Sequence, residues 1–267
     1  MKLDSARIEV GTGAGDAYRR LTPDRQRTLV APEDDMWATF ADMAEPYSLT
    51  LGTQLVGRFS VDDDAQLHGF HLSDDLEDAA ADVFDRIVSE LNITAAVAST
   101  VDPRFLALSL TRGGAPRPVA LMYDLATDPE SDETVAVRLA TSADHAAAVD
   151  FYQAETGSPE AFLTSFLAER IDLQELHLVE ADGRITATGE CRADHRSPGN
   201  AHLGLVVSSE LRGRGIGSRL MHSLAEICTG HDMTPRCSTE PTNVAAQSVI
   251  RRAGFRNRHQ IFRIAAQ

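Results

Sequence analysis

The chain has 267 residues, of which 43% are hydrophobic and 24% charged, a composition typical of a globular protein with one or two domains. A formal net charge of -15 argues against nucleic acid as the main partner, because binding to a phosphate backbone requires a basic face. No apolar run approaches the ~18 residues of a membrane helix and the N-terminus has no apolar signal-peptide core, so we expect a cytoplasmic protein without a membrane partner.

The three cysteines, Cys191, Cys228 and Cys237, all lie in the C-terminal half. Their number is odd and none of them forms a C-x-x-C pair. We therefore expect buried or free thiols in preference to disulfides or a zinc site, and no metal ion.

In the first half, alternating apolar residues predict strands, and apolar residues spaced by three and four predict helices. The predicted strands are 48–54, 55–61, 67–72, 94–99 and 119–123, and the predicted helices are 76–91 and 103–111. A polar stretch with a proline, 124–132, then interrupts the pattern. We place the domain boundary there, with one domain at residues 1–130 and the other at 131–267.

The second half repeats this alternation of strands and helices. The predicted strands are 134–139, 176–180, 184–192, 201–207, 236–239 and 260–264, and the predicted helices are 142–153, 158–170, 215–229 and 243–253. Asp182-Gly183 is a strong signal for a tight turn between two of the strands.

The two halves also share short sequence matches that occur in the same order. The segment SDDLE at Ser73 aligns with SSELR at Ser208, and the later matches are Ala98-Ser99-Thr100 with Cys237-Ser238-Thr239 and Arg112-Gly113-Gly114 with Arg252-Ala253-Gly254. This order predicts a duplication, and thus two α/β domains that each contain a mixed sheet flanked by helices.

Three glycines, Gly213, Gly215 and Gly217, lie between a predicted strand and a predicted helix. Free N–H groups in the first turn of a helix and the positive end of its dipole favour an anion at such a place. A nucleotide P-loop would need a Gly-Lys pair, which is absent, and a dinucleotide fingerprint would need glycine where Ser218 stands. An ordinary structural turn is the third alternative, but three spaced glycines flanked by Arg212 and Arg214 are hard to explain by folding alone.

The stretch LVVSSELRGRGIGSRLM resembles the acetyl-CoA signature of the GNAT superfamily of N-acyltransferases, V-x-x-x-x-[RQ]-G-x-G-[IL]-[GA], with every fixed position filled. Downstream, NVAAQSVIRRAGF resembles the last helix of that family, which carries an Asn and ends in Gly-Phe. The resemblance covers residues 134–267, and reaches 40–125 only through the internal repeat. It implies two GNAT-like domains, each a twisted mixed β-sheet flanked by helices.

The resemblance also implies a cofactor, acetyl-CoA, and the residues that contact it. Pantetheine, a chain of amides, would pair with an open strand edge at Leu205, Val206 and Val207. The remaining contacts are Arg212, which opens the turn, the pyrophosphate residues Gly213, Arg214, Gly215, Ile216, Gly217 and Ser218, and Asn243 near the pantetheine or the thiol.

The first copy has lost the features that would hold a phosphate. At the positions that correspond to the glycine turn it reads Glu77-Asp78-Ala79-Ala80-Ala81-Asp82. Like charges at ~4 Å repel by about 1 to 4 kcal/mol, so three carboxylates would exclude a pyrophosphate. We expect this copy to be degenerate and not to bind the cofactor.

The catalytic assignments rest partly on the resemblance, which makes the backbone N–H of Val207 the oxyanion donor. Many family members place a tyrosine where this chain has Ile250, so the thiolate would be protonated by Ser248, Tyr152 or water. The candidates for the base are Glu190, His195 and His202, and none of them stands out.

We therefore expect an acetyltransferase that moves an acetyl group from acetyl-CoA to the amine of a small molecule, by direct attack in a ternary complex. Such a protein would be a monomer or homodimer. A non-catalytic acyl-CoA sensor, suggested by Ile250 and the absence of an obvious base, and a structural protein that keeps only the fold are the alternatives.

Overall fold

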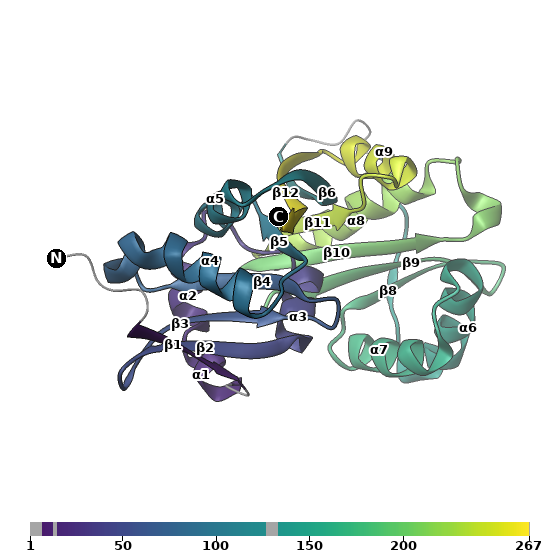
Figure 1. Cartoon of the computed structure of the whole chain (residues 1–267). Coiled ribbons are helices and arrows are strands. Elements are labelled where there is room, and N and C mark those ends of the chain that lie inside the picture. Colours follow the sequence, from purple (N-terminus) through teal and green to yellow (C-terminus); the bar gives the residue numbers. More distant parts are fainter. Residues whose placement is uncertain (1–6, 13–14, 127–132, 267) are drawn as a thin grey trace. The chain divides into compact units, whose positions relative to one another are not determined.

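The computed structural model describes residues 7–12, 15–126 and 133–266 (Figure 1). The chain divides into two compact units: the first is Met1–Leu121 with His259–Gln267, and the second is Met122–Arg258. The expected boundary after residue 130 lies outside the described residues.

The first unit contains all of the elements that its sequence pattern predicts. In chain order its elements are β1 (Ile8–Thr12), α1 (Gly15–Arg20), α2 (Thr22–Thr28), α3 (Asp35–Met43), β2 (Glu45–Leu51), β3 (Gln54–Val61), β4 (Gln66–Leu72), the 3-10 helix η2 (Asp74–Ala79), α4 (Ala80–Glu90), β5 (Ala95–Ser99), α5 (Pro103–Thr111) and β6 (Gly113–Leu125), which continues into the second unit. Helices α1, α2 and α3 were not predicted, because each has nine residues or fewer and too few turns for an apolar period to show.

The sheet of the first unit has the order β1-β2-β3-β4-β5-β12. Only β4 and β5 are parallel, and the other pairs with a described register are antiparallel. Strand β12 (Phe255–Ala266) comes from the end of the chain, and Ile261 to Ala265 pair with β5. The strand predicted at 260–264 therefore completes the first unit, whereas the sequence pattern places it in the second half.

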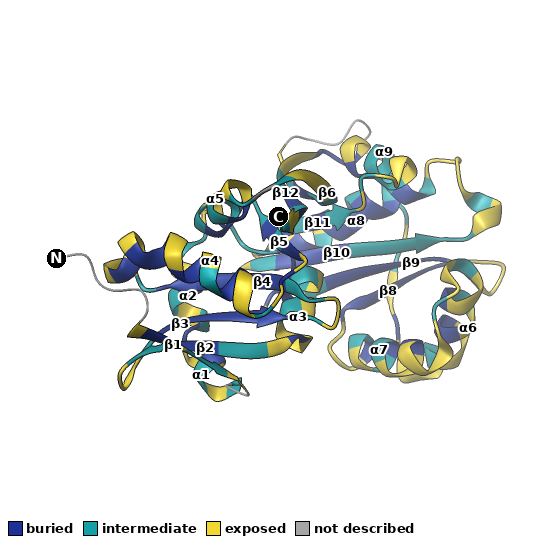
Figure 2. Cartoon of the chain, viewed as in Figure 1, coloured by how far each residue is buried: buried dark blue, intermediate teal, exposed yellow. Residues whose placement is uncertain are grey.

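An apolar core fills the space between this sheet and α4 and α5. Its largest fully buried side chains include Leu67, Phe59, Phe84 and Phe105. Buried and exposed positions alternate along α4 in Figure 2. Phe70 of β4 contacts Phe84 edge to face with ring centroids 5.4 Å apart, and it lies 6.5 Å from the ring of Phe105. Aromatic rings thus fill the space where β4, α4 and α5 meet.

The second unit contains a sheet with the order β6-β11-β10-β9-β8-β7. Its elements are β7 (Arg138–Leu139), η3 (Ser142–Asp144), α6 (His145–Thr156), α7 (Glu160–Asp172), β8 (Leu176–Ala181), β9 (Arg184–Ala193), β10 (Asn200–Val207), η4 (Ser209–Leu211), α8 (Ile216–Gly230), β11 (Thr234–Thr239) and α9 (Val244–Arg252), followed by the start of β12. Strands β10 and β11 are parallel, and β9 is antiparallel to both β8 and β10. Helices α8 and α9 lie on one face of this sheet and α6 and α7 on the other (Figure 1).

Two local predictions in this unit have different outcomes. The turn at Asp182-Gly183 is confirmed, with φ of 51° and 71° at the two residues, the left-handed conformation that a two-residue hairpin turn requires. The strand predicted at 134–139 is wrong for its first part, because only Arg138–Leu139 pairs with β8. The hydroxyl of Ser223 on α8 bonds both the N–H and the C=O of Val135, which holds that segment on the helix.

The duplication is visible in the structure as the same order of elements in both units. A strand (β4 or β10) leads through a 3-10 helix into a helix, a parallel strand and a second helix. Each copy also has an aspartate after the preceding strand that bonds a histidine: Asp62 to His68 at 2.9 Å, and Asp194 to His202 at 3.2 Å. Both aspartates accept nearby backbone N–H groups as well, so the pair anchors the same loop in each unit.

Candidate active site

The site begins where two parallel strands of the second unit separate. Strands β10 and β11 pair only over Asn200 to His202 and Thr234 to Arg236. From Leu203 to Val207, β10 keeps its partner β9 on one side and has no β11 register on the other. One edge of this segment is therefore open along its length.

The backbone N–H groups on the open edge belong to alternate residues. The N–H of Ser208 donates to the carbonyl of Thr186 on β9, 2.9 Å away. Because hydrogen-bonding groups alternate along an antiparallel pair, the N–H groups of Leu205 and Val207 point away from β9 and toward the opening. An extended chain of amides placed there would meet the same donors and acceptors as a neighbouring strand.

The three glycines of the turn have two different physical reasons. Gly213 and Gly215 have φ of 77° and 80°, a left-handed conformation that L side chains rarely adopt, and an added Cβ at either would have no described atom within 4 Å. Gly217 has a packing reason, because a Cβ there would lie 3.1 Å from Val249 Cγ2 on α9, a contact that Val249 would have to shift to relieve. The first two glycines shape the turn, and the third lets α9 approach α8.

Helix α8 begins directly after Gly215. A glycine at this position has no side chain that could cap the first N–H groups of the helix. The N–H groups in the first turn of a helix have no partner within the helix, and they carry the positive end of its dipole. The residues of this first turn, Ile216, Gly217 and Ser218, line the same opening as the edge of β10, an arrangement that favours an anion at the turn.

These features line one cleft of about 680 Å³. Of the residues expected to bind the cofactor, all except Arg214 line it: Leu205, Val206, Val207, Arg212, Gly213, Gly215, Ile216, Gly217, Ser218 and Asn243. The opposite wall comes from β11 and α9, with Cys237, Ser238, Thr239, Ser248, Val249 and Ile250. Sequence reasoning missed most of this wall, although the repeat had already marked the Cys237 to Thr239 segment.

Arg212 takes part in the turn through its side chain. Its Nε donates to the carbonyl of Val207 at 3.1 Å, and its Nη2 donates to Glu155 at 2.9 Å. Glu155, near the end of α6, also accepts the backbone N–H of Ser209 at 2.8 Å and its hydroxyl at 3.3 Å. The carboxylate of Glu155 therefore joins α6 to the start of the glycine turn.

Asn243 precedes the first residue of α9 and lines the cleft. Its Oδ1 accepts the backbone N–H of Ala246 at 3.0 Å, the contact expected of a helix cap. The cap fixes the start of the helix that forms the opposite wall. Ser248, further along the same helix, also lines the cleft.

Two of the candidate catalytic residues lie next to each other on the other face of the sheet. The hydroxyl of Tyr152 on α6 donates to Glu190 Oε1 at 2.7 Å, and Arg192 pairs with the other carboxylate oxygen of Glu190. Tyr152 and Glu190 are both 5% exposed and are not among the residues that line the cleft. Burial, and then the neighbouring Glu190 charge, raise the pKa of Tyr152 well above its usual value.

Glu190 nevertheless reaches the back of the cleft wall at Gly204. The two residues are register partners on β9 and β10, and an added Cβ at Gly204 would lie 3.4 Å from Glu190 Oε2. Gly204 itself lines the cleft. Arg192 Nη1 would lie 3.6 Å from the same Cβ, so the carboxylate and its arginine partner both lie behind the backbone of Gly204.

The two histidine candidates lie at the opposite end of β10 from the glycine turn. His202 is 3% exposed and bonds Asp194, and His195 is exposed in the β9–β10 loop. Val207 lies five residue steps along the strand from His202, about 17 Å at 3.3 Å per step. His202 is thus a structural partner of Asp194, and neither histidine lines the cleft.

The expectation of free thiols is wrong for two of the three cysteines. Cys191 on β9 and Cys228 on α8 form a disulfide, whereas Cys237 is buried and lies outside the disulfide. The two partners are 37 residues apart, and only the packing of α8 on the sheet brings their Cα atoms within 6.7 Å. Cysteine spacing alone carries no information about such a long-range contact.

Two sequence families match the chain, and together they cover most of it. The family described as "Acetyltransferase (GNAT) domain" matches residues 16–124, and "Acetyltransferase (GNAT) family" matches residues 149–255. The chain consists of two GNAT acetyltransferase domains in tandem. A search of curated proteins finds no match.

Solved structures of tandem length share this fold. An acetyltransferase of the GNAT family from Colwellia psychrerythraea is 29% identical, with a TM-score of 0.93, over 97% of this chain and 100% of that one. A GCN5-related N-acetyltransferase from Sphaerobacter thermophilus is 16% identical (TM-score 0.62; 97% and 96% covered). A tandem GNAT protein from the clavulanic acid biosynthesis pathway is 14% identical (TM-score 0.63; 97% and 99% covered). The last two show the fold alone.

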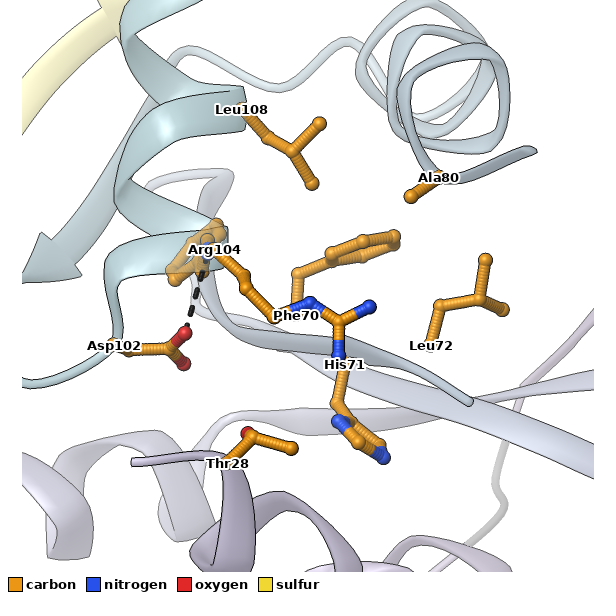
Figure 3. A pocket seen from close by; sticks show the side chains of 9 residues that line it. Thr28, Phe70, His71, Leu72, Ala80, Asp102, Arg104 and Leu108 are labelled. Atoms are coloured by element: carbon orange, nitrogen blue, oxygen red, sulfur yellow. Dashed lines mark hydrogen bonds between the residues drawn. The ribbon is translucent and has the colours of Figure 1, made fainter. Parts of the chain in front are cut away.

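The first GNAT domain has a pocket at the position of the cleft in the second, but it is almost filled. The pocket is about 20 Å³, the space of roughly one water molecule. Strands β4 and β5 separate after His68 just as β10 and β11 do, but Phe70, Phe105 and Leu108 line the small space that remains. Figure 3 shows the side chains of Phe70 and Leu108 there. Asp102 caps α5 by accepting the backbone N–H of Phe105 at 3.2 Å, the role that Asn243 has in the second domain.

Charged residues also differ between the two GNAT domains at this place. Arg104 on α5 pairs with Asp74 and lies 3.9 Å from Glu77, both on η2. Its side chain therefore links the two elements between which a cofactor would enter. Burial, and then Arg25, Arg58 and Arg104, lower the pKa of His71 in the same pocket to about 4.

Within the described residues, no helix is long and apolar enough to cross a membrane. The same residues hold no group of three or more His, Cys, Asp or Glu side chains arranged to bind a metal ion.

Proposed function

We propose that the second GNAT domain transfers an acetyl group from acetyl-CoA to the amine of a small molecule. One observation carries this proposal: the open edge of β10 and the free N–H groups of the glycine turn line the same cleft of about 680 Å³. An amide-binding edge that continues into an anion site matches the pantetheine and pyrophosphate of one extended cofactor.

In the proposed reaction the amine nitrogen attacks the thioester carbonyl directly. A C–N bond forms, the C–S bond breaks, the amine loses a proton and the CoA thiolate gains one. The N–H of Val207 points into the opening and would donate to the carbonyl oxygen as negative charge develops on it.

For the base, we propose Glu190. The support is its position behind Gly204, where an added Cβ would lie 3.4 Å from Glu190 Oε2, with Arg192 Nη1 at 3.6 Å from the same point. Tyr152 orients the carboxylate through their hydrogen bond. Glu190→Gln should keep acetyl-CoA binding and lose most of the turnover, whereas Glu160→Gln, which removes an exposed charge on α7, should leave both unchanged.

For the acid, we propose Ser248, with water as the alternative. Ile250, at the position where many members of the family have a tyrosine, is 3% exposed and lines the cleft with an apolar side chain. Ser248 lies on the same helix and lines the same wall. A thiol with a pKa of about 8.5 also leaves as the thiolate, so Ser248→Ala should lower turnover only severalfold.

We also propose that the first domain binds no cofactor, which makes the stoichiometry one acetyl-CoA per chain. The pocket of about 20 Å³ and the Arg104 link support this. Isothermal titration calorimetry with acetyl-CoA measures the number directly, and two equivalents would contradict the proposal.

The test of the main proposal is CoA release from acetyl-CoA over a panel of small amines, followed with a thiol reagent. Turnover with at least one amine supports the acetyltransferase. The alternative is a non-catalytic acyl-CoA sensor, favoured by Ile250 and by a Glu190 whose two oxygens are already bonded. Binding of acetyl-CoA without turnover on any amine would favour the sensor, and absence of binding would exclude both.

A further inference from the structure

The carboxylate of Glu155 holds the one arginine of the signature that lines the cleft. Arg212 donates from Nη2 to Glu155 at 2.9 Å, and both residues line the cleft. The Glu155 side chain is 11% exposed and that of Arg212 57%, so the carboxylate is fixed while the guanidinium lies at the surface. Among the described residues that line the cleft, Glu155 is the only acidic one.

Glu155 is held in place without Arg212. Its Oε2 also accepts the backbone N–H of Ser209 at 2.8 Å, and its Oε1 accepts the hydroxyl of Ser209 at 3.3 Å. Arg212 is also held twice, because its Nε donates to the carbonyl of Val207. The Glu155–Arg212 contact can therefore break while each residue keeps its other anchor.

We propose that acetyl-CoA competes with Glu155 for Arg212. This inference rests on the proposed function, because it assumes that the pyrophosphate of acetyl-CoA lies at the N–H groups of Gly213 to Ser218. A pyrophosphate there carries more negative charge than one carboxylate. Its binding residues begin at Gly213, directly after Arg212 in the sequence. Binding then transfers the Nη2 donor of Arg212 from Glu155 to the cofactor, and Glu155 keeps its bonds to Ser209.

The first domain supports this interpretation by contrast. The residue that corresponds to Arg212 is Glu77, and the ionic link there comes from Arg104 on α5, across the pocket. In the second domain the link comes from α6, on the other side of β10, and the cleft stays open. In the domain whose cleft has room for a ligand, Arg212 is therefore bound by a carboxylate from α6, and this ion pair does not close the cleft.

Competition predicts that removal of the Glu155 charge strengthens acetyl-CoA binding. A partly exposed ion pair shifts an equilibrium about two- to fivefold. Glu155→Gln keeps an oxygen that accepts the N–H of Ser209, and should therefore lower the Kd for acetyl-CoA about two- to fivefold. If Glu155 instead positions the turn for the cofactor, the same variant raises the Kd.

A double-variant cycle separates competition from simple repulsion between Glu155 and the phosphates. In an Arg212→Ala background, Glu155→Gln should leave the Kd unchanged, because no arginine remains to be released. An equal gain in affinity in both backgrounds would overturn the proposal. Glu160→Gln, an exposed charge on α7, is the matched control and should leave the Kd as it is.

The measurement is direct titration of the full chain with acetyl-CoA by calorimetry, without an acceptor amine. Thermal unfolding of each variant confirms that it is folded. If the unaltered protein does not bind acetyl-CoA, the proposed function fails. If it binds and Glu155→Gln does not tighten binding, only the competition between Glu155 and the cofactor is refuted.

Discussion

Replacement of Gly215 by alanine tests whether the shape of the glycine turn holds an anion. Gly215 has φ of 80° and ψ of -4°, directly before the first residue of α8. An L residue in this left-handed region costs about 1 to 2 kcal/mol, and no described atom lies within 4 Å of an added Cβ to offset or increase that cost. We expect the turn to relax to escape this cost, which rotates the N–H of Ile216.

The stability effect is small and the binding effect large. About 1 to 2 kcal/mol corresponds to a fall in Tm of roughly 2 to 8 °C for a chain of this size. A misdirected N–H removes a hydrogen bond to a charged group, worth about 1.5 to 3 kcal/mol, so the Kd for acetyl-CoA should rise about ten- to hundredfold.

Gly183→Ala is the matched control for this experiment. Gly183 has φ of 71° in the β8–β9 turn and also has no described atom within 4 Å of an added Cβ. Both variants should lose similar stability by differential scanning fluorimetry, and only Gly215→Ala should lose affinity by calorimetry. The reasoning is refuted if Gly215→Ala loses stability as Gly183→Ala does and still binds acetyl-CoA like the unaltered chain.

Three further predictions concern stability. Reduction of the Cys191–Cys228 disulfide should lower the free energy of unfolding by about 4 kcal/mol, from the loss of a closed loop of 37 residues, and a denaturation midpoint that is the same with and without dithiothreitol would contradict this. Burial opposes ionisation of Asp194, but hydrogen bonds from His202 and from two backbone N–H groups hold its pKa below the usual value. The stability that the ionised Asp194 contributes is therefore present above about pH 4 and is lost as pH falls through the folded-state pKa. The difference in Tm between Asp194→Asn and the unaltered chain should be smaller at pH 3 than at pH 7. Tyr152→Phe should destabilise the domain by about 1 to 3 kcal/mol, because it removes the donor to a buried Glu190 oxygen. In the unaltered chain, Tyr152 should stay protonated above pH 10 until the domain unfolds, as measured by phenolate absorbance. Ionisation of all tyrosines near pH 10 in the folded protein would refute this second prediction.

Much of the fold was readable from local sequence. The helix predicted at 215–229 is observed at Ile216–Gly230, and that predicted at 103–111 is observed at Pro103–Thr111. Each of these helices has an apolar period together with a glycine turn or a proline at its start. These signals lie within or next to the helix, so the local sequence is enough to predict it. The strand predicted at 134–137 was wrong, because the hydroxyl of Ser223, far along the chain, bonds the backbone of Val135.

For the candidate site, the sequence by itself determined the residues of the turn, since the signature from Val207 to Gly217 is contiguous and Gly213 and Gly215 are fixed by backbone geometry. Only the tertiary structure decided what faces that turn. It brought β11 and α9 to the opposite wall, Glu155 from α6 to Arg212, and Cys191 to Cys228, and it showed that aromatic side chains fill the first domain's pocket. These contacts join residues far apart in the chain, and their partners are selected by packing, which no local pattern records.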